Sequence, residues 1–77
     1  MLDAKLVGKC IKTLRENQKL SQEVLSGFDD IGRTHLSAIE RGQRKPTLDT
    51  FFKISEALNL KPSELMKIIE SEDNKTR

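Results

Sequence analysis

Residues 21–42, SQEVLSGFDDIGRTHLSAIERG, constrain the fold of this chain more than any other stretch. Their apolar residues recur at helical spacing on either side of a short acidic turn, which is typical of two helices joined at a fixed angle. Ser21 can cap the first helix, expected over residues 21–28. The second, expected over residues 32–41, ends on Gly42, which can take the left-handed conformation that closes helices.

Three further helices are expected to surround this pair. Each has apolar residues at intervals of three and four, and each begins at a capping residue or a proline. Their expected ranges are 3–17, 47–59 and 62–70. In the middle one, Leu48, Phe51, Ser55 and Leu58 share one face, which is expected to pack on the core. Because no strand signal is present, the sequence predicts a compact, five-helix, all-α domain over residues 1–70. Residues 71–77 contain no apolar side chain, and we expect a frayed polar tail there.

The composition limits the kinds of function that the chain can have. Cys10 and His35 are the only residues of their types among 77 residues, so neither a disulfide nor a Cys/His metal site is expected. No apolar run approaches the roughly 18–20 residues that cross a membrane, and the N-terminus lacks the pattern of a secretory signal peptide. We therefore expect a cytoplasmic protein without metal or cofactor. We do not expect an enzyme, because the chain has no Gly-rich phosphate loop and no recognisable nucleophile and base.

Positive charge gathers in one part of the chain. Residues 33–45 carry four bases against one acid, a local net charge of +3, whereas residues 1–32 balance at zero with five bases and five acids. The four bases are Arg33, Arg41, Arg44 and Lys45. Since the excess lies on one helix and the loop after it, a polyanion could use it.

The helix expected over residues 32–41 has a buried and an exposed side. Leu36 and Ile39 belong to the core by their spacing. The residues left facing outward include Arg33, Thr34 and Ser37. A guanidinium can bind guanine O6 and N7 together, and a threonine offers a methyl for thymine and a hydroxyl for a base or phosphate. The alternative for each is an ordinary solvated side chain.

Two other groups of side chains lead to expectations. His35 is expected on the flank of the same helix, where it contacts the DNA backbone or packs on residues 21–28. The apolar residues of the last two helices exceed what one face of a small bundle needs, which predicts a two-fold interface between copies of the chain. The residues expected there are Phe52, Leu60, Met66 and Ile69. The alternative is that all of them are intramolecular core.

Four motifs in register resemble a known family. They are S-Q-E at 21–23, R-T-x-L-S-x-I-E-R-G at 33–42, K-P-T-L-x-T at 45–50 and L-x-P-S-E-L at 60–65. Together they resemble the phage-repressor/Cro-like helix-turn-helix proteins of the xenobiotic-response-element (Xre) type, over about residues 7–69. Within that family the sequence is most similar to the controller proteins of restriction–modification systems.

The resemblance implies a lambda-repressor-like domain whose third helix reads DNA bases, and a homodimer that regulates transcription from a palindromic operator in double-stranded DNA. It assigns base reading to Arg33, Thr34 and Ser37. It places along the DNA backbone Gln22, Arg41, Gln43, Arg44 and Lys45, and it implies that Gln22 also braces the third helix. It also implies an ion pair between Arg15 and Glu40. The sequence departs from the family at Asp29 and Asp30 in the turn, and at Ala38, where some relatives carry a base-reading side chain.

Two alternatives remain open at this point. Exposed acids, namely Asp29, Asp49 and Glu56, could offer a surface to RNA polymerase, so that activator and repressor are both consistent with the sequence. The same fold could instead serve as an antitoxin-like protein–protein module that does not read DNA. No small-molecule ligand is expected, since no sensing domain follows the five helices.

Overall fold

The structure, a computed structural model, describes the backbone of residues 2–75 and, within that range, every side chain except that of Asp29. It contains five α-helices and one 3-10 turn, and no strand within the described range. The elements are α1 (Ala4–Asn17), α2 (Gln22–Gly27), η1 (Phe28–Asp30), α3 (Arg33–Glu40), α4 (Leu48–Ala57) and α5 (Pro62–Lys75). The predicted five-helix, all-α fold is confirmed. Among the described residues, no helix has the length and apolar character needed to cross a membrane.

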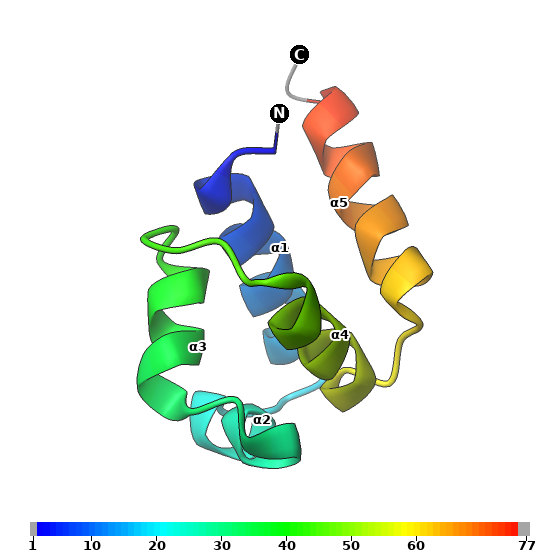
Figure 1. The fold of residues 1–77 in the computed structure, drawn as a ribbon. Coiled ribbons are helices and arrows are strands. Elements are labelled where there is room, and N and C mark those ends of the chain that lie inside the picture. The colour runs from blue at the N-terminus through cyan, green and yellow to red at the C-terminus, as the bar shows by residue number, and fades with distance from the viewer. Residues whose placement is uncertain (1, 76–77) are drawn as a thin grey trace.

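The helices pack around a single core (Figure 1). The first helix, α1, packs against both α3 and α5, while α2 packs against α3, and α4 bridges η1 and α5. Every α-helix and the turn before α3 supply buried apolar side chains. These are Val7, Cys10, Ile11, Leu25, Ile31, Leu36, Ile39, Phe51, Ile54, Leu58, Leu65 and Ile69.

Three helices begin at the capping residues that the sequence indicated. Asp3 Oδ1 accepts a hydrogen bond from the backbone N–H of Lys5 at 3.1 Å. Ser21 Oγ accepts one from Val24 at 3.1 Å, and Thr47 Oγ1 accepts one from Thr50 at 3.2 Å. Each cap satisfies a backbone donor that the helix leaves free, which is typically worth about 1 kcal/mol.

The connection between α2 and α3 depends on two residues with positive φ. Asp30 has φ +54°, a left-handed conformation that aspartate adopts more readily than most residues. Gly32, which precedes α3, has φ +86° and ψ 125°, a conformation that is comfortable only for glycine. Between them Ile31 points into the core with 6% of its surface exposed. The two positive-φ residues thus change the direction of the chain between the end of α2 and the start of α3.

Gly8 allows two helix backbones to approach closely. A Cβ on Gly8 would lie 2.7 Å from the backbone oxygen of Glu40 and even closer to that of Ile39. The first helix therefore crosses the end of α3 backbone to backbone. This explains why a glycine occupies the interior of a helix, where it ordinarily costs about 0.5–1 kcal/mol.

Three expectations about the helices are wrong. The last helix continues through Lys75, so residues 71–75 are helical and do not form a frayed tail. An ion pair between Lys75 Nζ and Glu72 Oε1, at 3.1 Å, lies within this last turn. Residues 76–77 lie outside the described range. The second helix ends at Gly27, and Phe28 enters the 3-10 turn half-exposed. Leu48, expected on the core face of α4, is 74% exposed because it occupies the first position after the cap, beyond the reach of the core.

Candidate nucleic-acid interface

The start of α2 and the outward side of α3 together line a shallow hollow on the surface. The residues that line it are Gln22, Arg33, Thr34, Ser37 and Arg41. Arg33, Thr34 and Arg41 are exposed, whereas Gln22 and Ser37 are half-buried. The structure therefore brings together three residues expected to read bases and two expected along the backbone.

The periodicity of α3 produces this arrangement. Leu36 and Ile39 have no exposed surface, and Glu40 is buried as well. These positions define the inner side of the helix, so side chains at the intervening positions point outward. Ala38 is half-buried and has no polar atom beyond its backbone. The outward side therefore carries a short set of polar groups near the helix start.

A buried ion pair fixes α3 relative to α1. Arg15 Nε donates to Glu40 Oε2 at 2.7 Å, and Arg15 Nη2 donates to Glu40 Oε1 at 3.0 Å. The two side chains are only 9% and 1% exposed. Hydrogen bonding to Glu40 raises the pKa of Arg15 above its ordinary value, against a smaller opposing effect of burial. Such a two-bond geometry holds both groups in one orientation.

The same pair reaches two further elements. Arg15 Nη1 donates to the backbone oxygen of Leu20 at 2.7 Å, in the loop before α2. Gln22 Nε2 donates to Glu40 Oε1 at 3.0 Å. Glu40 thus binds side chains from both α1 and α2, and it fixes the first residue of α2 at the edge of the hollow. The resemblance implied that Gln22 braces the third helix but named no partner for it, and that partner is Glu40.

The loop after α3 carries the remaining basic residues. Arg41, Gln43, Arg44 and Lys45 are all exposed. Gly42, with φ +77°, turns the chain out of α3, and Arg41 Nη2 donates to Gln43 Oε1 at 3.2 Å. The loop therefore continues the charged surface from the end of α3 toward α4.

His35 does not line the hollow. It is half-buried on the flank of α3, between the outward residues and the core. Within the part of the chain that the structure describes, no group of three or more His, Cys, Asp or Glu residues could hold a metal ion. What this surface can do is donate hydrogen bonds and present positive charge, which suits a phosphate-rich polymer.

The residues expected between two copies of the chain divide into two groups. Phe52 and Met66 are 56% and 38% exposed, and Leu60 is half-buried. Ile69 is fully buried inside the monomer, because it lies on the face of α5 that packs into the core. The expectation that it belongs to an intermolecular interface is therefore wrong.

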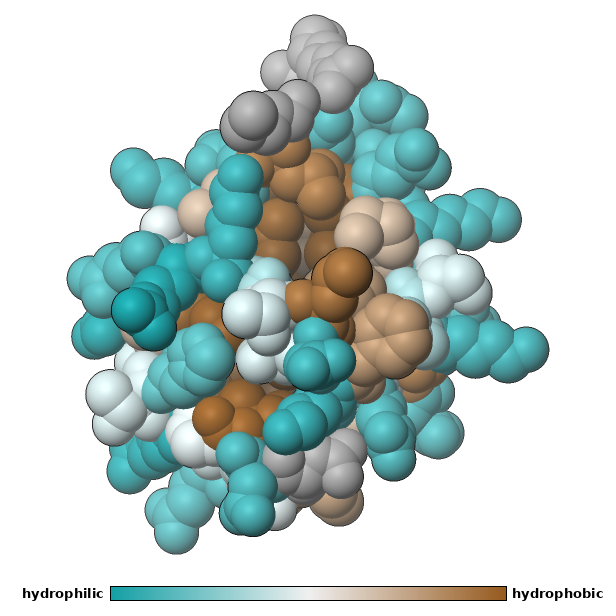
Figure 2. All heavy atoms as spheres, in the orientation of Figure 1, coloured by the Kyte–Doolittle hydropathy of each residue, from teal (hydrophilic) through white to brown (hydrophobic). Residues whose placement is uncertain are grey.

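Leu48 was missed by sequence reasoning, which assigned it to the core of α4. It lines one pocket with Met66 and lies one helical turn before Phe52. We call Leu48, Phe52 and Met66 the apolar face. Figure 2 shows apolar side chains gathered over α4 and between it and α5.

Comparisons with known proteins agree with this geometry. A sequence model of the helix-turn-helix family matches residues 11–65. The control protein C.BamHI of Bacillus amyloliquefaciens is 40% identical over 62 residues, which cover 79% of this chain and 76% of that protein. The control protein C.MunI of Mycoplasma sp is 42% identical over 66 residues, 84% and 89% of the two chains.

A solved structure is similar as well. The crystal structure of the restriction–modification controller protein C.AhdI from Aeromonas hydrophila has a TM-score of 0.78 and 35% sequence identity to this chain. The match covers 82% of this chain and 96% of that one.

Proposed function

The chain belongs to the helix-turn-helix family, and on that premise we propose that it is a cytoplasmic, sequence-specific DNA-binding regulator of transcription that acts as a homodimer on a palindromic operator. The similarity to control proteins supports a narrower role, the controller of a restriction–modification system. In this role the chain binds DNA and has no enzymatic activity of its own.

One observation carries the proposal. The hollow contains Arg33, Thr34 and Ser37 on a helix whose other side is wholly buried, and it opens beside a loop of exposed bases. A helix held this way can enter the major groove with its first residues toward the base edges. Arg33 then binds a guanine, worth about 1–3 kcal/mol of discrimination against a wrong base, while Ser37 contacts phosphate or sugar.

The backbone contacts follow from the same placement. Gln22 lies at the edge of the hollow, and His35 lies on the flank of the helix. The loop residues Arg41, Gln43, Arg44 and Lys45 extend the contact along the phosphates. Such contacts supply affinity without reading sequence, and they weaken as salt rises.

The apolar face supports a two-fold dimer. Leu48 and Phe52 expose 74% and 56% of their surfaces on one stripe of α4. Met66 on α5 lines a pocket together with Leu48. An isologous contact through this face would bury all three and place two copies of α3 on one side of the dimer. The half-sites would then be about 34–36 Å apart, one turn of DNA.

The test is selection of binding sites from a random duplex pool, followed by titration of the selected and scrambled duplexes. We expect a palindrome, and we expect Arg33→Ala to lose discrimination at one position in each half-site. Arg33→Lys, which keeps the charge but not the planar fork, is the matched control and should lose the same preference with less loss of affinity. Equal binding of selected and scrambled DNA would contradict the proposal and favour the antitoxin-like protein-binding alternative.

Contact with RNA polymerase is a further part of the proposal. Asp49 and Glu56 are exposed on α4, whereas the side chain of Asp29 lies outside the described set. If these acids contact polymerase, substituting both by Asn and Gln would abolish activation in a transcription assay and leave operator affinity unchanged. Unchanged transcription would exclude that contact.

A further inference from the structure

The first turn of α1 lies directly against the turn that follows α3. A Cβ built on Gly42 would lie 2.6 Å from Cγ and 2.8 Å from Cα of Lys5. The absence of a side chain at Gly42 therefore lets the backbone of α1 and the stem of Lys5 rest on this turn. Gly42 separates Arg41 from Gln43, two residues that we place along the DNA backbone. Lys5 is consequently a neighbour of that loop in space, although it is far from it in sequence.

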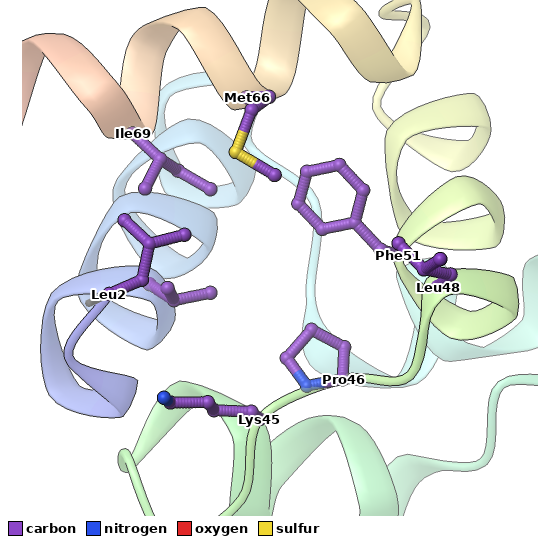
Figure 3. A pocket seen from close by; sticks show the side chains of 8 residues that line it. Leu2, Lys45, Pro46, Leu48, Phe51, Met66 and Ile69 are labelled. Atoms are coloured by element: carbon purple, nitrogen blue, oxygen red, sulfur yellow. The ribbon is translucent and has the colours of Figure 1, made fainter.

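The loop contacts the start of α1 at a second point. The stem of Lys45 and the ring of Pro46 line an apolar pocket of about 110 Å³ together with Leu2 and Val7 (Figure 3). In this view Lys45 extends from the loop toward Leu2, which precedes α1. The loop is thus held against the first residues of the chain at Gly42 and again at Lys45 and Pro46.

Lys5 adds a fourth base to the three of the loop. Lys5 is exposed and forms no ion pair with another described residue. Asp3 is the acid next to it in sequence, and its carboxylate is engaged in capping α1 through the backbone N–H of Lys5. The four bases are Lys5, Arg41, Arg44 and Lys45. Together with Asp3 they carry a net charge of +3, the same as the three loop bases alone.

We propose that Lys5 is an additional contact to the DNA backbone, so that the first turn of α1 forms part of the phosphate-binding surface. This inference rests on the proposed function. A lysine is a compact charge on a flexible stem, which suits a phosphate but not the reading of a base. The contact therefore adds salt-dependent affinity and no sequence preference.

The test compares Lys5→Gln with Lys12→Gln, which serves as a matched control. Lys12 is exposed on the same helix, seven residues later and on nearly the same side, about 10 Å farther from the loop. The affinity of each full-length variant for the selected duplex is measured from 50 to 200 mM salt. Each phosphate contact that is lost lowers the slope of log affinity against log salt by about 0.9.

For Lys5→Gln we expect a slope lower by about 0.9 per chain. The ratio of the affinity of the unmodified protein to that of the variant should then fall about 3.5-fold per chain between 50 and 200 mM salt. Base preference and melting temperature should not change, and Lys5→Arg should restore the slope. Lys12→Gln should keep the original slope. An unchanged slope for Lys5→Gln, or an equal decrease in both variants, would overturn the contact. Failure of the unmodified chain to prefer any duplex would instead overturn the proposed function.

Discussion

Glu40→Ala should be strongly destabilising, because it breaks a buried ion pair. It removes the acceptor of two bonds from Arg15, at 2.7 and 3.0 Å, and of one from Gln22 at 3.0 Å. Arg15, with 8% of its surface exposed, would keep only its bond to the oxygen of Leu20. Stranding a buried charge in this way costs about 3–5 kcal/mol.

That loss is large for a chain of this length. At about 0.05–0.15 kcal/mol per residue, its free energy of unfolding should be about 4–12 kcal/mol. We expect a melting temperature at least about 12 °C lower, from about 4–8 °C per kcal/mol in small domains. The assays are thermal melting and urea unfolding, both followed by far-ultraviolet circular dichroism, because the chain has no tryptophan or tyrosine to report by fluorescence.

A second variant separates loss of the pair from loss of packing. Arg15→Met with Glu40→Leu removes both charges and keeps most of the volume, so it should be within about 1 kcal/mol of the unmodified protein, since replacing a whole buried pair is often neutral. The reasoning would be refuted by Glu40→Ala costing less than 1 kcal/mol, or by the double variant being as unstable as the single one.

Three further predictions address packing, pH and assembly. Gly8→Ala should destabilise by about 1–3 kcal/mol in thermal melts, because its Cβ would meet the backbone of α3, whereas Gly27→Ala, with nothing within 4 Å, should gain about 0.5–1 kcal/mol. Burial raises the pKa of the Cys10 thiol above its ordinary value, with Glu72 adding to the rise. The unfolded thiol therefore loses its proton first, and stability should fall as pH rises above about 8.5, less steeply in Cys10→Ala. Phe52→Lys should sediment as a monomer at concentrations where Val24→Lys, at a site of similar exposure on α2, remains a dimer.

Local physical rules were sufficient to predict the positions of most of the helices from the sequence. Helix caps depend only on neighbouring residues, and the expected caps are present at Asp3, Ser21 and Thr47. Helical spacing is local as well, and it correctly indicated that Leu36 and Ile39 are buried. The end of α5 lies beyond the expected range, because residues 71–75 carry no apolar side chain whose spacing could indicate a helix. A helix already nucleated by packing needs no further apolar residues to add one turn.

Exposure on the last two helices could not be obtained from spacing alone. Leu48 and Ile69 both fit an apolar stripe, yet Leu48 is exposed and Ile69 is buried, because the position of α4 against α5 decides which side chains the core can reach. The Arg15–Glu40 pair joins residues 25 positions apart, so periodicity gives no sign of it. It was expected only through the resemblance to a family. The bond from Gln22 to the same carboxylate required coordinates.

The close crossing at Gly8 has a consequence for how a DNA sequence would be recognised. At Gly8, α1 meets the end of α3 backbone to backbone, so no side chain lies at this crossing point whose rotamer could change to shift the recognition helix. Packed backbones deform little, so the two helices should move as one rigid unit. Any misfit between this unit and a half-site then has to be accommodated by the duplex. Operators that bend or twist easily should be preferred, even at base pairs that no side chain touches.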